Sequence, residues 1–86
     1  MKIHNLKIWP KFYQAVKDGR KRFEVRENDR QFEEGDILRL QEWSEANGYT
    51  GEEMMVPVTY ILYGSSFGVR DGYYVMPIGE EINITG

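Results

Sequence analysis

The segment GRKRFEVR, residues 19–26, organises this chain, because it places four cations and one carboxylate around two apolar side chains. Gly19 supplies the chain reversal that ends a helix. Beyond it, charged residues at positions 22, 24 and 26 alternate with Phe23 and Val25, which is the period of a strand with two unlike faces. We expect this strand to bury its apolar face and to display a row of charge that can receive a polar ligand.

The length and composition of the chain predict one domain. Its 86 residues, 41% hydrophobic and 14% aromatic, can form a single modest core without disulfides. The absence of cysteine excludes disulfides, thiolate metal ligands and a cysteine nucleophile. We expect one domain over residues 1–78 and a loosely ordered tail over residues 79–86.

The N-terminal sequence, MKIH, runs straight into polar and helical residues and does not resemble a signal peptide. No apolar run approaches the roughly 20 residues of a membrane span. We therefore expect a cytoplasmic protein with no membrane partner.

The charge is distributed unevenly along the chain, whose net charge is −3. Residues 1–30 hold nine Lys/Arg and four Asp/Glu, whereas residues 31–86 hold two Arg and ten Asp/Glu. A basic surface on an acidic protein suits a small anionic or nucleotide-like ligand better than a long duplex, where many phosphates must be neutralised. Ordinary solvated charge explains the same distribution equally well.

A short strand at residues 3–8 is expected before a helix at about residues 10–18, with Pro10 as its first residue. The apolar stripe of this helix comprises Phe12, Ala15 and Val16, with Tyr13 as a further candidate.

The rest of the chain reads as short strands separated by turns. We expect a turn at 27–30 and then a strand at 37–43 with Leu38 and Leu40 inward. A loop at 44–51, with a hairpin turn at Asn47-Gly48, should lead to a return strand at 53–63. One face of the return strand comprises Met54, Val56, Val58, Tyr60 and Leu62, and a glycine-rich connection at 64–72 precedes a closing strand at 73–78. This order predicts an α+β fold, a small and mostly antiparallel β-barrel with one helix inserted after the first strand.

The pattern Gly19-x-Lys21-x-x-Glu24-x-Arg26, followed by Gly35-Asp36, resembles the signature of the ASCH domain, a PUA-like barrel. Further segments resemble a small phage and bacterial ASCH-related family of uncharacterised function. These segments are LKIWP at 6–10, FEVR at 23–26, NDR at 28–30, GDIL at 35–38, EW at 42–43, YTG at 49–51 and VTYIL at 58–62. The resemblance covers about residues 3–78. It implies a PUA-like barrel with a cleft beside the helix, lined by Lys21, Glu24 and Arg26, and a role in RNA or modified-nucleotide recognition.

Some ASCH proteins are amidohydrolases that deacylate N4-acylated cytidine with a Lys, a Thr nucleophile three residues later and a distant Glu. Lys21 matches the first of these, but Glu24 occupies the Thr position. A carboxylate does not replace a hydroxyl that must attack an amide, although it can serve as the base for a water. The distant acid has four candidates, which are Glu42, Glu52, Glu53 and Asp71.

Lys21 and Glu24 point to opposite sides of an ideal strand, so their meeting requires a bulge or the placement of Lys21 in the Gly19 turn. Arg26 lies on the same face as Glu24, where it can clamp Glu24 or offer its guanidinium to a phosphate or a base edge. The alternative is a set of surface ion pairs worth ~0–1 kcal/mol each.

Other residues are weaker candidates. Arg30, with Asp29, either orients Arg26 or belongs to a turn. Trp9 and Tyr63 each lie at the end of an element and are candidates for stacking on a base. We predict that His4, the sole histidine, is a hydrogen-bonded structural residue. We expect no metal and no cofactor.

The sequence thus predicts an RNA- or modified-nucleotide-binding module that uses Lys21, Glu24, Arg26, Arg30, Trp9 and Tyr63. The alternative is an amidohydrolase acting on an N-acylated nucleobase such as N4-acetylcytidine, with Glu24 as the base for water and Lys21 stabilising the oxyanion. A further alternative is a host-directed interaction domain that works through its acidic C-terminal part. The sequence makes no prediction of the oligomeric state.

Overall fold

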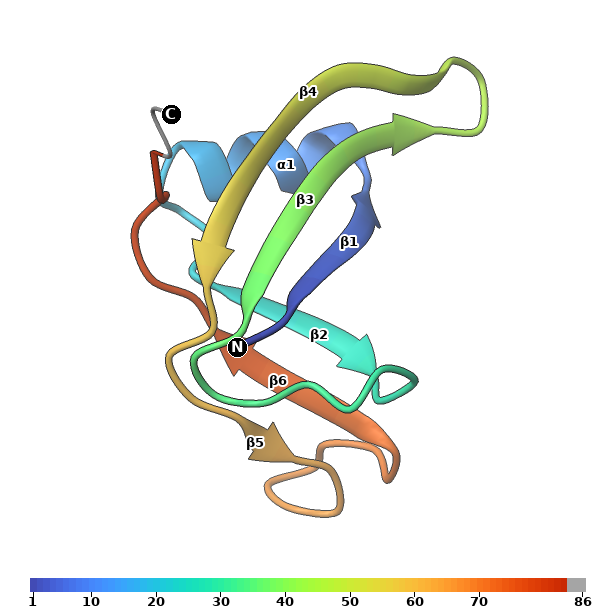
Figure 1. Ribbon diagram of the computed structural model, residues 1–86. Helices are drawn as coiled ribbons and strands as arrows, with labels where there is room; N and C mark the ends of the chain where they lie inside the picture. The colour runs from blue at the N-terminus through green and yellow to red at the C-terminus, as the bar shows by residue number, and fades with distance from the viewer. Residues whose placement is uncertain (84–86) are drawn as a thin grey trace.

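A computed structural model describes residues 1–83 of the chain, and Figure 1 shows the arrangement of their secondary structure. The elements in chain order are β1 (Ile3–Ile8), α1 (Pro10–Lys17), β2 (Phe23–Glu27), β3 (Ile37–Ser44), β4 (Gly48–Pro57), β5 (Leu62–Tyr63) and β6 (Tyr73–Pro77). The prediction of a small, sheet-rich fold with one short helix after the first strand is confirmed.

The strands form two three-stranded sheets, ordered β1-β3-β4 and β2-β6-β5. In the first sheet β3 and β4 are an antiparallel hairpin, whereas β1 lies parallel to β3 with Leu6 opposite Leu40. The second sheet is antiparallel throughout. The parallel pairing of β1 and β3 requires a long crossover between them, and the segment that contains α1 and β2 provides it.

The two sheets meet where β4 and β6 end. Val58 and Ile78 form an isolated antiparallel bridge between them, and the Thr59 N–H donates to the Pro77 carbonyl at 3.0 Å. This corner brings the second sheet across the first, as Figure 1 shows. Closure of the strands into a complete barrel stays a prediction.

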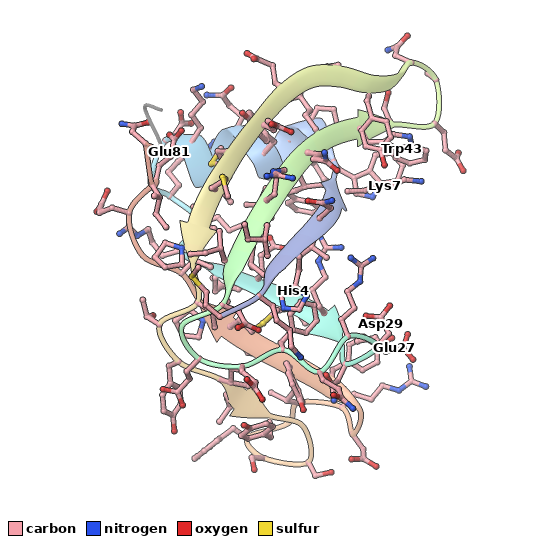
Figure 2. All side chains as sticks on the ribbon, viewed as in Figure 1. His4, Lys7, Glu27, Asp29, Trp43 and Glu81 are labelled. Carbon is pink, nitrogen blue, oxygen red and sulfur yellow. The ribbon has the colours of Figure 1, made fainter. Side chains whose placement is uncertain are left out.

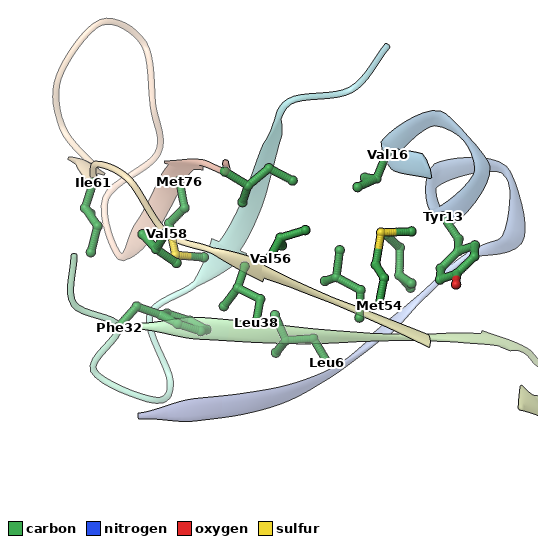
Figure 3. Packing of buried hydrophobic residues seen from close by; sticks show 13 residues of the cluster. Leu6, Tyr13, Val16, Phe32, Leu38, Met54, Val56, Val58, Ile61 and Met76 are labelled. Atoms are coloured by element: carbon green, nitrogen blue, oxygen red, sulfur yellow. The ribbon is translucent and has the colours of Figure 1, made fainter. Parts of the chain in front are cut away.

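The core lies between the first sheet on one side and α1 with the second sheet on the other (Figure 3). Leu38 and Leu40 are fully buried, as the alternation along β3 predicts. The other members of the cluster are Leu6, Ile8, Tyr13, Val16, Phe32, Met54, Val56, Val58, Ile61, Met76 and Ile78.

The helix buries part of the predicted stripe. Tyr13 and Val16 are buried, but Phe12 is exposed. A helix of eight residues, about two turns, presents only a narrow stripe to the sheet. Tyr13 and Val16, three residues apart, lie on the same side of the helix and occupy that stripe.

The expected loop at residues 44–51 is largely strand, which corrects the prediction. β3 continues to Ser44 and β4 begins at Gly48, with Ser44 opposite Gly48 across the hairpin. A shift in register between Gln41 and Trp43 lets both strands continue in this way.

The return strand also ends earlier than predicted, at Pro57. The chain there turns to pair with the second sheet, and this turn breaks the alternation expected through residue 63. As a result Tyr60 is exposed and Ile61 is buried, while Leu62 is half-buried.

The described part of the predicted tail is hydrogen-bonded to β4. The Gly79 N–H donates to the Pro57 carbonyl and the Ile82 N–H donates to the Met55 carbonyl at 2.7 Å. Residues 84–86 of the predicted tail lie outside the described residues. Among residues 1–83, no helix has the length and apolar character needed to cross a membrane.

Asp36 is a buried carboxylate that joins the starts of β1 and β3. It accepts hydrogen bonds from His4 Nε2 at 2.8 Å, the Lys2 N–H at 3.1 Å and the Glu33 N–H at 3.0 Å. Burial by itself would raise the pKa of this carboxyl, but these three hydrogen bonds outweigh it and hold the pKa below its usual value. The prediction that His4 is a hydrogen-bonded structural residue is confirmed.

Replacement of Asp36 by Asn should lower the free energy of unfolding at pH 7 by roughly 2–3 kcal/mol. The NH₂ group of the amide would then face a donor where a carboxylate oxygen now accepts from His4, Lys2 or Glu33. The folded pKa is depressed, so this carboxylate stabilises the fold at pH values above about 3.8 and loses its effect as the pH falls through the folded pKa. Urea denaturation at several pH values should show the difference between wild type and Asp36→Asn shrinking in acid. Asp29→Asn, at an exposed acid, is the control, and equal losses in the two variants would contradict the assignment.

Candidate functional site

The second strand presents its faces the opposite way round from the prediction. Glu24 is only 3% exposed, whereas Phe23 and Val25 are 44% and 49% exposed. The strand therefore buries its charged face and shows its apolar face to solvent. The expectation that Phe23 and Val25 would be buried is wrong.

Two cations compensate the buried carboxylate. Lys21 Nζ donates to Glu24 Oε1, and Arg26 Nε donates to Glu24 Oε2 at 2.9 Å. Both cationic side chains keep part of their surface exposed, 18% for Lys21 and 27% for Arg26. A carboxylate with a cation on each oxygen satisfies the condition for burying an ion, and it holds the two cations side by side at the surface.

The turn after the helix brings Lys21 to Glu24. Gly19 has a φ of 81°, and the Lys21 N–H donates to the Ala15 carbonyl at 3.0 Å. Lys21 thus lies in the turn before β2 begins, where strand alternation does not constrain its direction. Of the two routes by which this pair could meet, the structure uses the turn.

Arginine side chains bridge β2 and the following turn to the free edge of β1. Arg26 donates to the Lys7 carbonyl at 2.7 Å, and Arg30 donates to the Asn5 carbonyl at 2.6 Å. The Lys2 carbonyl accepts a hydrogen bond from the Ile37 N–H of β3. Carbonyls alternate in direction along a strand, so the carbonyls of residues 5 and 7 point away from β3. The arginines therefore satisfy backbone acceptors that no strand pairs.

A cleft of about 450 Å³ opens beside this bridge. Its size falls within the range of small-molecule sites, roughly 300–1,000 Å³. Exposed aromatic side chains form much of its wall, and Lys21 Nζ lies 5.0 Å from the Phe23 ring centroid and 5.7 Å from that of Phe12. The lining residues are Lys7, Ile8, Trp9, Phe12, Lys21, Phe23, Glu24, Val25 and Arg26.

The cleft brings together four of the predicted site residues, which are Lys21, Glu24, Arg26 and Trp9. Arg30 lies outside the lining but caps the same strand edge. Tyr63 lies elsewhere, in β5, where it packs edge-on against Tyr74 at 4.9 Å between ring centroids.

The acids considered as distant partners are not in the cleft lining either. Glu42 and Glu53 lie on the β3–β4 hairpin, where they accept hydrogen bonds from Thr50 and Gln41, and Asp71 accepts one from Ser65. Among residues 1–83, no group of three or more His, Asp or Glu side chains is arranged to hold a metal ion.

Sequence reasoning missed Lys7, Phe12 and Phe23 as lining residues. The helical stripe predicts a core position for Phe12, and strand alternation predicts one for Phe23. One signal in the sequence bears on Phe23. Glu24 has Lys21 three residues before it and Arg26 two residues after it, and these two cations can neutralise a buried carboxylate. If Glu24 is buried, strand alternation places Phe23 on the exposed face. No local signal marks Lys7, whose position depends on the pairing of β1.

The chain is similar to one protein family and to one phage protein. A family model described as "Domain of unknown function (DUF3850)" matches residues 3–78. The chain is also similar to an "Uncharacterized 12.9 kDa protein in GpA 3'region" of Escherichia phage P2, at 40% identity over 58 residues. That match covers 67% of this chain and 52% of the phage protein, so it spans about half the relative's length.

Replacement of Glu24 by Ala should lower the free energy of unfolding by roughly 3 kcal/mol, because it leaves two neighbouring cations without their shared carboxylate. Glu27→Ala is the matched control, since Glu27 is an exposed acid on the same strand, labelled in Figure 2. This control should stay within about 0.5 kcal/mol of wild type. Chemical denaturation of the two variants measures the difference, and equal stability would contradict the structural role of Glu24.

Proposed function

The chain belongs to the DUF3850 family, and we propose that it binds a nucleotide, within RNA or free and in plain or modified form, in the cleft between β1 and β2. The observation that carries this proposal is the meeting of exposed aromatic walls with two oriented cations in one cleft.

The aromatic walls suit the base of such a ligand. Trp9 and Phe12 at the start of α1 and Phe23 at the start of β2 are exposed large apolar side chains, and all three line the cleft. Stacking of a base on an aromatic side chain contributes ~1–3 kcal/mol and tolerates chemical modification of the base edge. A pocket lined in this way favours a flat, aromatic ligand.

The cations suit the phosphate. Lys7, Lys21 and Arg26 line the cleft together with a single carboxylate, Glu24, whose oxygens each accept a hydrogen bond from a cation. The site therefore keeps an excess of positive charge. Because Glu24 orients Lys21 and Arg26 before any ligand arrives, less conformational entropy is lost on binding.

The resemblance to ASCH domains supports the same assignment. We propose that the two sheets form an open PUA-like barrel, joined by the Val58–Ile78 bridge and left unpaired between β1 and β2. In this arrangement the cleft lies at the gap where Arg26 spans from β2 to the Lys7 carbonyl. A gap bridged by a side chain leaves room for a ligand that a backbone ladder would exclude.

Hydrolysis of an N-acylated nucleobase is the second candidate, favoured by the contact between Lys21 and Glu24. In this function Glu24 takes a proton from the attacking water and Lys21 donates to the oxyanion. As the C–N bond breaks, Glu24 returns that proton to the leaving N4 nitrogen, which gives the free base and a carboxylic acid. The engagement of both Glu24 oxygens by cations favours the binding role, in which Glu24 anchors the two cations.

Titration with short single-stranded RNA oligomers, plain and modified, should show micromolar binding that weakens with salt. Trp9→Ala should weaken binding about 10-fold through the loss of a stacking surface. Arg26→Ala should weaken it too and reduce the salt dependence, with thermal unfolding to verify that this variant folds. Arg20→Ala is the control, because Arg20 is an exposed cation paired with Asp18 outside the cleft. A flat response to all ligands would contradict the proposal.

Incubation with N4-acetylcytidine distinguishes binding from hydrolysis. If the chain only binds, chromatography should show no conversion to cytidine even at high protein concentration. Conversion that disappears in Lys21→Ala would instead establish the amidohydrolase, since it would require the oxyanion donor.

A further inference from the structure

A second aromatic and basic cluster lies next to the cleft, on the β3–β4 hairpin. Trp43 and Tyr49 are paired across the hairpin, and Lys7 Nζ lies 4.4 Å from the Trp43 ring centroid and 5.9 Å from that of Tyr49. Figure 2 shows Lys7 beside Trp43 near the hairpin end. We call Lys7, Trp43 and Tyr49 the hairpin cluster.

The hairpin cluster is continuous with the cleft. Lys7 belongs to both, because it lines the cleft and lies over the Trp43 ring. Trp9, which also lines the cleft, packs edge-on against Trp43 with 5.9 Å between ring centroids. The cleft that Trp9, Phe12 and Phe23 line is therefore joined to Trp43 and Tyr49 through Trp9 and Lys7.

We propose that the hairpin cluster is a second base-stacking subsite, and that the ligand is a single-stranded segment of nucleic acid at least two nucleotides long. This inference rests on the proposed function and extends it, because a mononucleotide would fill the cleft alone. One base occupies the cleft, the next stacks at Tyr49 and Trp43, and the phosphate between them meets Lys7.

Stacking, with one cation on the phosphate, carries the second subsite. Lys7 lies between the two subsites, and Arg39 on β3 donates to the Asn5 side-chain oxygen at 3.0 Å. The hairpin itself contributes only acids between Gln41 and Glu53, which are Glu42, Glu45, Glu52 and Glu53. The ligand is single-stranded because bases stack on side chains only when they are not stacked within a duplex.

The experiment compares uridine mononucleotide with oligouridylates of two, four and six residues, and with the corresponding deoxyribonucleotides. Wild type should bind the tetramer at least about 10-fold more tightly than the mononucleotide, as expected for one further stacked base. Tyr49→Ala should remove this gain and leave mononucleotide binding unchanged. Tyr60→Ala is the matched control, since Tyr60 is 55% exposed against 57% for Tyr49 and lies outside both subsites.

A fluorescence readout tests the same subsite without truncating it. Trp9→Phe leaves Trp43 as the only tryptophan and keeps an aromatic ring in the cleft. Its fluorescence should be quenched by the tetramer and not by the mononucleotide. A preference for the ribose form narrows the ligand to RNA, and equal binding assigns it as single-stranded nucleic acid of either sugar.

The outcomes separate the two proposals. Two results would overturn the second subsite and leave nucleotide binding in the cleft intact. One is equal affinity for ligands of all lengths. The other is a loss of tetramer affinity in Tyr49→Ala that is no larger than the loss in Tyr60→Ala. Failure of wild type to bind any nucleotide or oligomer overturns both.

Discussion

The burial of Glu24 between Lys21 and Arg26 is the interaction on which the rest of the site depends. A buried carboxylate requires compensating charge, and the two cations that supply it must lie on the same side of β2 as Glu24. Strand alternation then sends Phe23 and Val25 to the opposite, solvent-facing side. The orientation of the two cations and the exposure of Phe23 and Val25 therefore have a common cause.

The cleft also lies where backbone pairing stops. The sheets are joined at the corner formed by Val58 and Ile78, whereas the edge of β1 that faces β2 is capped by the side chains of Arg26 and Arg30. A side-chain bridge leaves room for a ligand that a continuous ladder of backbone hydrogen bonds would exclude. The same residues thus stabilise the fold and shape the cleft, so binding is most cleanly tested at Trp9 and Tyr49, which are exposed and carry no buried charge.

Much of the fold could be predicted from local patterns. Pro10 and Gly19 mark the ends of the helix, the alternation around Leu38 and Leu40 marks a half-buried strand, and Asn47-Gly48 marks the hairpin. The errors arose where tertiary contacts override the local pattern. β4 ends at Pro57 because the chain crosses to the second sheet there, and Phe12 is exposed because Tyr13 and Val16 already fill the stripe of a two-turn helix.

The sequence by itself determined which residues are candidates for the site: the charges of segment 19–26, the turn at Gly19 that lets Lys21 approach Glu24, and an aromatic residue at the end of β1. Only the tertiary structure decided which face of β2 is buried, because alternation marks two faces without saying which one is inside. It also decided that Lys7 and Trp9 adjoin Trp43 and Tyr49, since β1 meets β3 only through a long crossover. Contacts between residues so far apart in the chain depend on strand pairing, which local sequence does not encode.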